Sequence, residues 1–398
     1  MTKQTRAFAA RWIFPVSSPP IHGGWVRMDR QQIVEVGQGA APTDAEDLGD
    51  VALLPGLVNA HTHLEFSDCD APIGEPGIAL YRWVGQVITA RQSATGQAKA
   101  AAIAKGLQES FDAGVSLVGE IATLPSEYPS QSDFPPQNQS PELITFAETI
   151  GLSQQRGDER FAHTEQHVQT QPDGGISPHA PYSTSRPLIE RCVQLACQTN
   201  RPLAMHVAES PAERQLLCDG SGPFAETLKQ LGVWDASLFP WGGQPFEWLI
   251  DQLAKAPYGL LVHGNDLQVS DIEKIANHPS LSVVYCPRTH HFFGYPPHPV
   301  HAMLERGVRV ALGTDSRASN PDLNLWREIQ FLLNQRPDID PEEVLGMGTI
   351  WGADAMGRFR HGRLQRGSFA RFNLVSTSAK TLQGVYRDFA EQPLKRGV

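Results

Sequence analysis

Cysteine is scarce in this chain of 398 residues, and its few positions fit no recognisable disulfide framework. The five cysteines form no CxxC pair, and their odd number leaves one without a partner in any disulfide scheme. Because disulfides persist in oxidising compartments, this usage predicts a protein of a reducing compartment, the cytoplasm. The cysteines are Cys69, Cys192, Cys197, Cys218 and Cys286.

Long hydrophobic runs and an excess of positive charge are also lacking. The first thirty residues are broken by polar residues and prolines, so they contain neither a signal-peptide core nor the roughly 20 apolar residues of a membrane span. The chain has 33 Lys+Arg against 43 Asp+Glu, and the net charge of -10 opposes binding to nucleic acid or to an anionic membrane surface. We therefore expect neither nucleic acid nor a membrane as a partner.

What is present indicates a large globular α/β domain, since 40% of the residues are hydrophobic and 19% are charged. Apolar runs recur eight times, and most are continuous, as in parallel strands that are covered on both faces. Helical patterns lie between several of them, and eight βα units are typical of a TIM-type (β/α)8 barrel. The expected strands are 53–61, 115–121, 143–151, 175–182, 202–209, 259–267, 281–287 and 308–316, and the expected helices include 98–113, 186–199, 224–231, 246–255 and 298–306.

The two ends of the chain contain short strand-like runs separated by Pro and Gly turns. Neither end is long enough to bury its own core, so we expect the two to pair into a composite β-sandwich. The predicted domains are this sandwich, from residues 1–54 and 355–398, and the barrel of residues 55–354. Parts of the stretches 125–140 and 152–175 are too polar for a core and are interpreted as surface loops.

Ligand-type side chains end the expected strands, at the face where barrel active sites are built. His61 and His63 lie two residues apart on one strand, so they face the same way and can bind one ion. An isolated His-x-His is otherwise an accidental surface pair, but other strand ends also carry polar groups, which favours the metal interpretation. These further groups are Glu120, Glu148, His179, His206, His263 and Asp315.

The strings PGLVNAHTHLE, HVAES, VHGND and GTDS, in this order and at these separations, make the chain similar to the amidohydrolase superfamily. Within it, the chain resembles the branch of cytosine deaminase and adenosylhomocysteine deaminase, over almost its whole length. The resemblance implies that His263 positions the hydrolytic water and that Glu209 is the glutamate of the deaminase HxxE motif. It also implies a set of metal ligands, which are His61, His63, His206 and Asp315.

The chemistry of these residues agrees with the implied roles. Three neutral imidazoles and one carboxylate suit Zn²⁺ first and Fe²⁺ second, with an open position for a water whose pKa falls to roughly 7. Expelling an amino group from an aromatic ring also needs a carboxylic acid beside the metal, and Glu209 is expected to lie there. The water needs a base, which is expected to be His263 with Asp315. The lysines lie away from the strand ends, whereas binuclear members usually bridge their metals with a carbamylated lysine, so one divalent ion is favoured.

Substrate contacts are predicted around this centre, each with a structural alternative. His179 matches the histidine of a HAPY motif that contacts substrate, or it makes a structural hydrogen bond at a strand end. Glu65 reads a ring N–H or amino group, or it forms a structural salt bridge. The Tyr81-Arg82-Trp83 run covers the base as a lid, or it is one face of an amphipathic helix. The predicted substrate-binding residues are Glu65, Arg82, Trp83, Glu148, His179, Arg288 and His290.

The function predicted from the sequence is that of a metal-dependent aminohydrolase that releases ammonia from an amino-substituted heterocycle. The string HTHLEFS, the Arg82-Trp83 pair and the CPRTHHFFG loop look like the aminodeoxyfutalosine deaminase type, so an adenine-type nucleoside is the expected substrate. Guanine- or cytosine-type deaminases and triazine chlorohydrolases share the metal frame and stay open as alternatives. A metal-free, non-catalytic scaffold is a hypothesis of another class, which the complete ligand set opposes. A homodimer is left open.

Overall fold

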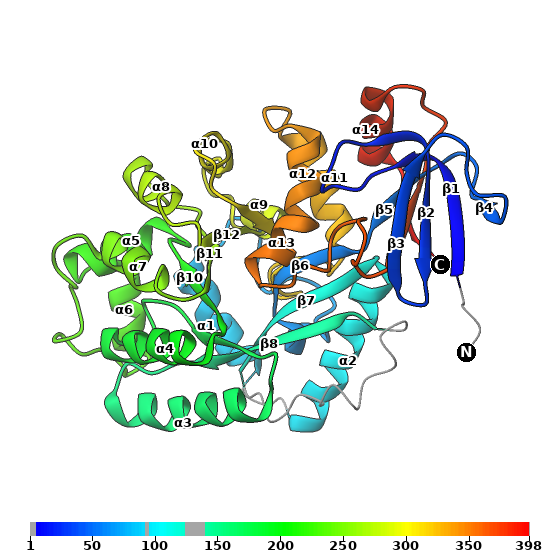
Figure 1. The fold of residues 1–398 in the computed structure, drawn as a ribbon. Helices are drawn as coiled ribbons and strands as arrows, with labels where there is room; N and C mark the ends of the chain where they lie inside the picture. Colours follow the sequence, from blue (N-terminus) through cyan, green and yellow to red (C-terminus); the bar gives the residue numbers. More distant parts are fainter. Residues whose placement is uncertain (1–4, 92–94, 124–139, 398) are drawn as a thin grey trace.

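A parallel barrel and a smaller sheet make up the protein (Figure 1), for which the computed structural model describes residues 5–91, 95–123 and 140–397. The eight barrel strands pair in chain order, and the ends of the sheet meet where Thr62 pairs with Asp315. This arrangement confirms the predicted barrel. Its strands are β6 (Leu57–Thr62), β7 (Val115–Ala122), β8 (Glu142–Thr149), β9 (Gly175–Pro178), β10 (Pro202–Val207), β11 (Tyr258–His263), β12 (Leu281–Tyr285) and β13 (Val310–Leu312).

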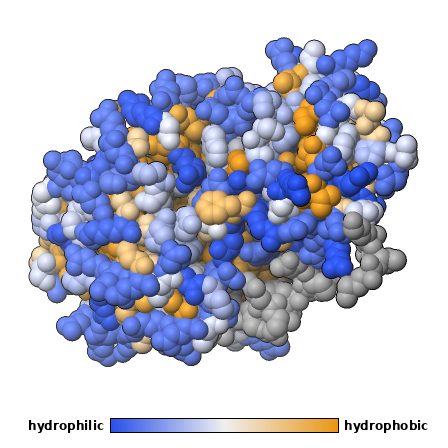
Figure 2. Space-filling view, viewed as in Figure 1, coloured by the Kyte–Doolittle hydropathy of each residue, from blue (hydrophilic) through white to orange (hydrophobic). Residues whose placement is uncertain are grey.

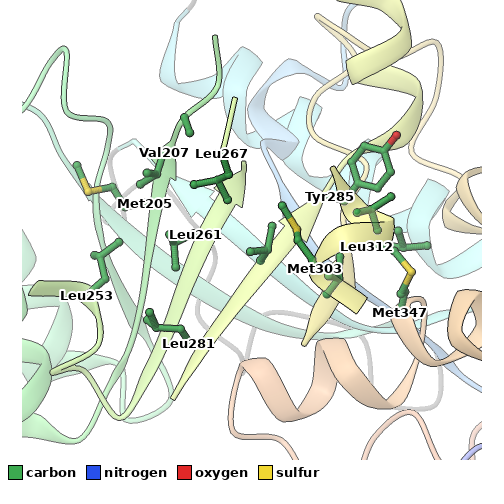
Figure 3. Close-up of a cluster of buried hydrophobic side chains, with 14 of the residues drawn as sticks. Met205, Val207, Leu253, Leu261, Leu267, Leu281, Tyr285, Met303, Leu312 and Met347 are labelled. Carbon is green, nitrogen blue, oxygen red and sulfur yellow. The ribbon is translucent and has the colours of Figure 1, made fainter. Parts of the chain in front are cut away.

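The barrel strands are apolar on both faces because helices cover the outside and side chains fill the inside. On β10, Met205 and Val207 pack outward in the cluster shown in Figure 3, while Ala204 joins the inner cluster. Residues two apart on a strand share a face, so His206 points into the barrel like Ala204. A histidine among buried apolar neighbours is therefore placed at the barrel mouth by the strand itself.

Helices follow most barrel strands, and those predicted from periodicity are present with boundaries shifted by at most a few residues. The outer helices are α1 (Leu80–Arg91), α2 (Gly96–Asp112), α3 (Gln154–Thr170), α4 (Arg186–Thr199), α5 (Pro211–Asp219), α6 (Pro223–Gln230), α7 (Pro245–Leu253), α8 (Val269–Ala276), α9 (Pro287–Phe293), α10 (Val300–Glu305), α11 (Leu325–Gln335), α12 (Pro341–Met347) and α13 (Ile350–Ala355).

The interpretation of residues 152–175 as a surface loop is wrong, because α3 occupies most of that stretch. This helix is strongly polar and buries only a narrow stripe that includes Phe161 and Val168. Ser153 caps it by accepting a hydrogen bond from the amide of Arg156. Nearly all of the other predicted loop, 125–140, lies outside the described residues.

Both ends of the chain contribute to the smaller sheet, as predicted. It curls over a core that includes Phe8, Ile13 and Phe372, and β14 pairs antiparallel with β5. The helix α14 (Leu382–Glu391) packs beside α11. The strands of this sheet are β1 (Thr5–Ile13), β2 (Ile21–Asp29), β3 (Gln32–Gln38), β4 (Ala45–Asp47), β5 (Val51–Pro55), β14 (Phe372–Ser376) and β15 (Leu394–Arg396).

The run 53–61, expected to be one strand, is divided between the two sheets. The chain leaves β5 at Pro55 and enters β6 at Leu57, with Gly56 between them. A Cβ at Gly56 would lie 2.5 Å from the Cβ of Ser116, so the close approach of the two sheets requires glycine.

The surface is largely polar, as the space-filling view in Figure 2 shows for one face. In the described part of the chain, the large apolar residues that are exposed lie on or after four different helices, α1, α6, α8 and α13. Among the residues that the structure describes, no helix combines the length and apolarity that crossing a membrane requires. The exposed large apolar residues are Ile88, Leu231, Val233, Val269 and Phe359.

An ion-pair cluster at the start of β8 ties the barrel to the segment after α13, and it predicts a pH-dependent stability. Burial raises the pKa of Glu142, but His361 (3.0 Å) and Arg358 (3.2 Å) outweigh it, so the pKa is lowered overall. A carboxyl group whose pKa is lower in the folded than in the unfolded chain stabilises the fold at pH values above its unfolded pKa of about 4.3. This stabilisation is lost as the pH falls through the pKa of the folded state.

We expect Glu142→Gln to reduce the free energy of unfolding by about 1 to 3 kcal/mol at pH 7, because the buried His361 and the half-buried Arg358 lose their charged acceptor. The deficit should be smaller at pH 4, where the wild-type carboxylate is partly protonated in the unfolded chain. Urea unfolding at both pH values measures this, with the exposed Glu165→Gln as the control. Equal deficits at both pH values would contradict the assigned ion pairs.

Candidate metal centre and active site

The four predicted metal ligands converge at the mouth of the barrel. His61 lies in β6, His63 directly follows it, His206 lies in β10, and Asp315 follows β13. The Nε2 atoms of His63 and His206 are 3.3 Å apart, and Oδ1 of Asp315 is 3.7 Å from Nε2 of both His61 and His63. The structure therefore brings together, around one point, residues that are more than 250 positions apart in sequence.

These side chains fit a single divalent cation. His61 is completely buried and neither of its ring nitrogens has a hydrogen-bond partner, a costly state unless an ion uses the lone pair. Two nitrogens bound tetrahedrally at about 2.0 to 2.1 Å would lie about 3.3 to 3.4 Å apart, which agrees with the His63–His206 separation. Burial lowers the pKa of His61, His63 and His206, so all three are neutral and able to ligate.

Hydrogen bonds behind the ligands direct their free atoms toward this point. Nδ1 of His206 donates to the carbonyl oxygen of His179 (2.8 Å), which leaves Nε2 facing His63. Oδ2 of Asp315 accepts a hydrogen bond from the Ser319 hydroxyl (2.7 Å), and the backbone carbonyl oxygen of Asp315 accepts one from the Thr62 hydroxyl (2.8 Å). The sequence analysis missed Ser319 and Thr62, because a hydroxyl in a loop or strand carries no distinctive signal.

Glu209 and His263 lie together beside this centre. The His263 ring stacks on His206 at 5.3 Å between centroids, and its Nε2 is 3.5 Å from Oε1 of Glu209. The hydroxyl of Tyr182 donates to Oε2 of Glu209 (3.3 Å). Burial, then the charges of Asp315 and Glu213, raise the pKa of Glu209 well above its usual range, which favours the protonated form of this carboxyl.

The backbone is strained where three of these strands end. Ala208, His263 and Asp315 have φ values of +55, +73 and +55, in the left-handed region that non-glycine residues rarely adopt. Such strain costs on the order of 1 to 3 kcal/mol per residue and gathers at functional sites. The sharp turns direct the side chains of residues 209, 263 and 315 to one place, and sequence periodicity could not show them.

A second polar group adjoins the centre through His179. Its Nδ1 is 2.6 Å from Oγ of Ser183, and its Nε2 is 3.8 Å from Oε1 of Glu148. Burial, then the charge of Glu65, raise the pKa of Glu148 to about 7. The carboxyl group of Glu65 is thus close enough to influence the ionisation of Glu148.

Glu65 itself satisfies the structural alternative that was left open for it. Its Oε1 accepts a hydrogen bond from Thr123 (2.5 Å), and its Oε2 forms a salt bridge with Lys99 (3.6 Å). These contacts orient the carboxylate and leave its predicted substrate contact untested.

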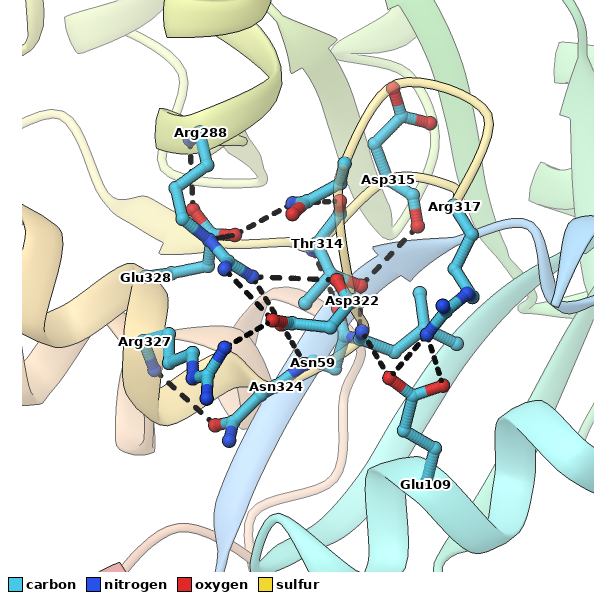
Figure 4. Close-up of polar contacts among 12 residues, drawn as sticks. Asn59, Glu109, Arg288, Thr314, Asp315, Arg317, Asp322, Asn324, Arg327 and Glu328 are labelled. Atoms are coloured by element: carbon cyan, nitrogen blue, oxygen red, sulfur yellow. Dashed lines mark hydrogen bonds and ion pairs between the residues drawn. The ribbon is translucent and has the colours of Figure 1, made fainter. Parts of the chain in front are cut away.

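Other predicted substrate contacts are held by the protein itself. Each of the three guanidinium nitrogens of Arg288 donates to Asp322 or Glu328, in the network of Figure 4. The shortest nitrogen–oxygen distance is 2.6 Å to each of the two carboxylates. The indole of Trp83 donates to the carbonyl oxygen of Ala318 (3.2 Å). Because the guanidinium nitrogens of Arg288 already bind these two carboxylates, we leave Arg288 out of the proposed site.

Arg82 and His290 occupy contrasting environments. Arg82 is exposed on α1, with its guanidinium near the Tyr81 ring. His290 is buried on α9 against Tyr285 and His298, and burial lowers its pKa to about 4. Substrate binding by Trp83, Arg82 and His290 remains a prediction.

If the ligand set is right, replacing one member should empty the centre. We expect His61→Ala and Asp315→Ala each to reduce bound metal from about one ion per chain to a small fraction and to abolish activity, because an incomplete shell binds weakly. Elemental analysis measures the metal. The control is His167→Ala, which removes another buried histidine, on α3, and should keep its ion. Full occupancy in either ligand variant would refute the assignment.

Comparisons of the sequence with known proteins find similarity to deaminases. An aminodeoxyfutalosine deaminase from Deinococcus radiodurans is 28% identical over 330 residues, 79% of this chain and 76% of that protein. A 5-methylthioadenosine/S-adenosylhomocysteine deaminase from Nitratidesulfovibrio vulgaris is 24% identical over 399 residues, 95% of this chain and 83% of that protein.

Solved structures show the same fold. Helicobacter pylori aminofutalosine deaminase in complex with methylthio-coformycin matches 99% of this chain and 100% of its own, with a TM-score of 0.82 and 20% identity. A zinc-bound adenosine deaminase from Xanthomonas campestris covers 97% of this chain and 89% of its own, with a TM-score of 0.74 and 24% identity. The model of the Amidohydrolase family matches residues 52–396. The chain therefore belongs to the amidohydrolase family, as its motifs indicated.

Proposed function

We propose that this protein is a metal-dependent aminohydrolase that deaminates an adenine-type nucleoside and releases ammonia. The observation that carries the proposal is Glu209, a buried carboxyl group that lies beside the cluster of ligands, 3.5 Å from Nε2 of His263. A metal site alone serves many hydrolases, but replacing an amino group on a heterocycle requires a proton donor for the ring. The deaminases among its relatives support the same reaction.

We propose Zn²⁺ as the ion, with Fe²⁺ second, held by His61, His63, His206 and Asp315. A zinc-bound structural neighbour supports Zn²⁺, and so does the proposed donor set of three imidazoles and one carboxylate. When bound, such an ion lowers the pKa of a water and makes it a nucleophile at neutral pH.

The remaining steps fall to side chains of this chain. Glu209 donates its proton to the ring nitrogen as the water oxygen bonds to the adjacent ring carbon. His263, with Asp315, accepts the proton that the water gives up, because a neutral imidazole can accept one. The amino nitrogen then takes the proton held by His263, and its bond to the ring carbon breaks to release ammonia. The hydroxyl on that carbon becomes a carbonyl and returns its proton to Glu209.

The carboxyl pair of Glu65 and Glu148, with His179, is the proposed contact for the rest of the substrate. Carboxylates accept hydrogen bonds from hydroxyl or amino groups, which a nucleoside of this type offers. We propose aminodeoxyfutalosine as the substrate, supported by the relative from Deinococcus radiodurans, with 5-methylthioadenosine or S-adenosylhomocysteine second. We also propose a cytoplasmic location, supported by five free cysteines.

Ammonia release from a panel of substrates tests the function directly. The panel holds aminodeoxyfutalosine, 5-methylthioadenosine, S-adenosylhomocysteine, adenosine, guanine and cytosine, with a chlorotriazine assayed for chloride. We expect kcat/KM to be highest for an adenine nucleoside. Turnover of the chlorotriazine alone, or of none of the panel by metal-loaded protein, would contradict the proposal.

Glu209→Gln separates proton transfer from binding, because glutamine keeps the size and polarity of the side chain but cannot donate an acidic proton. We expect kcat to fall by roughly 10²-fold or more while the metal content is unchanged. Glu142→Gln is the control: it alters a carboxyl at the start of β8, away from the centre, and should keep normal turnover. Unchanged turnover in Glu209→Gln would remove Glu209 from the mechanism.

His263 needs its own test, because its nitrogen also lies within 4.8 Å of ligand atoms of His61 and His206. We expect His263→Asn to lower kcat by roughly 10²-fold while the ion stays bound, since a base is lost and no ligand is. Loss of the ion would make His263 a ligand instead. A change in KM alone would assign it to substrate binding.

A further inference from the structure

The segment that carries Glu209 between β10 and α5 owes its shape to a strained backbone. Ala208 has a φ of +55, so the chain turns sharply just after β10 and just before Glu209. An alanine adopts this conformation only where its surroundings enforce it. The direction of the Glu209 side chain therefore depends on whatever holds residues 207–209.

Hydrogen bonds to neighbouring residues hold this short segment at each backbone position. Its carbonyl oxygens at residues 207, 208 and 209 accept from the loop after β11, at 3.1, 2.8 and 3.0 Å. The amides of Ala208 and Glu209 both donate to the carboxylate of Glu213, one to each oxygen and each at 2.8 Å. Glu213 is completely buried, so no water competes for these bonds. The donors from the loop are Gly264 N, Asp266 N and Asn265 Nδ2.

Glu213 occupies a position that usually serves only its own helix. Ser210 caps α5, and a glutamate three residues after such a cap normally accepts the amide of the cap residue. Here the carboxylate extends past Ser210 to the two preceding residues. The neighbouring helix α8 shows the ordinary arrangement, since Asp271 accepts the amide of its own cap residue, Gln268 (2.9 Å).

We infer that Glu213 is a positioning residue that holds the Glu209 carboxyl where it can transfer a proton to the substrate. The two adjacent amides donate to one buried carboxylate, and these bonds fix the orientation of the two peptide groups on either side of the Ala208 Cα. From the second of these peptide groups, the Glu209 carboxyl reaches both the Tyr182 hydroxyl (3.3 Å) and Nε2 of His263 (3.5 Å). Among the described residues, Glu213 forms no hydrogen bond or ion pair with a proposed metal ligand. Its effect on Glu209 therefore passes through the backbone. The inference rests on the proposed role of Glu209.

The test compares two buried helix-start carboxyl groups in the metal-loaded protein. Glu213→Gln leaves one acceptor for two amides, and we expect kcat on the best substrate of the panel to fall roughly 10- to 100-fold, since small misplacements of a catalytic group cost that much. Metal content and KM should stay within about twofold of wild type. Asp271→Asn removes the matched carboxylate and should leave kcat within about twofold.

Hydrogen–deuterium exchange gives a reading that does not depend on activity. Peptides covering residues 207–210 should exchange faster in Glu213→Gln than in wild type and should be unchanged in Asp271→Asn. If Glu213→Gln does not fold, Glu213→Asp takes its place, since it keeps both carboxylate oxygens on a side chain one methylene shorter. In this variant we again expect faster exchange at residues 207–210. The loss of kcat should be smaller than in Glu213→Gln but at least about threefold.

The outcomes separate this inference from the proposed function. A folded Glu213 variant with wild-type kcat and exchange would overturn the inference, and so would an equal loss of kcat in Asp271→Asn. A wild-type protein that releases no ammonia from the panel would instead overturn the proposed function, while the exchange result would still report on the contact.

Discussion

The closure of the barrel at Thr62 and Asp315 is the constraint on which the rest of the site depends. The last strand meets the first where Thr62 pairs with Asp315, and the Thr62 hydroxyl donates a hydrogen bond to the carbonyl oxygen of Asp315. Closure brings the one proposed carboxylate ligand beside His61 and His63, at 3.7 Å from each. If the ends of the sheet were apart, the imidazoles would remain but their anionic partner would not.

Burial then sets the protonation states that the chemistry needs. The same exclusion of water lowers the pKa of the histidines, which favours neutral rings that can ligate or accept a proton, and raises the pKa of Glu209, which favours the form that can donate one. Opposite roles thus follow from a single physical cause acting on groups of opposite charge. The cost includes the buried ring of His61, which has no hydrogen-bond partner, and three strained strand ends. A bound ion would offset the first, and the surrounding hydrogen bonds offset the second.

Much of this could be predicted from sequence, because the informative features are local. Continuous apolar runs indicated the barrel strands, and histidines at their ends indicated the centre that the structure assembles. The helix α3 was missed because its buried stripe is narrow, and the break at Gly56 because a run of apolar residues does not show which sheet it joins. The ion pairs of Arg288 link residues more than 30 positions apart, and the reach of Glu213 past its own cap depends on the φ of Ala208. Such features exist only in the folded chain.

The central claim is that one divalent ion lies among His61, His63, His206 and Asp315, with Glu209 and His263 beside it but not bound to it. Anomalous diffraction from crystals of zinc-loaded protein, measured above and below the zinc absorption edge, tests it most directly. The account predicts a single peak per chain within about 2.0 to 2.2 Å of these four side chains. A peak coordinated by Glu209 or His263, a second peak in the mouth of the barrel, or no peak at the four ligands would contradict it.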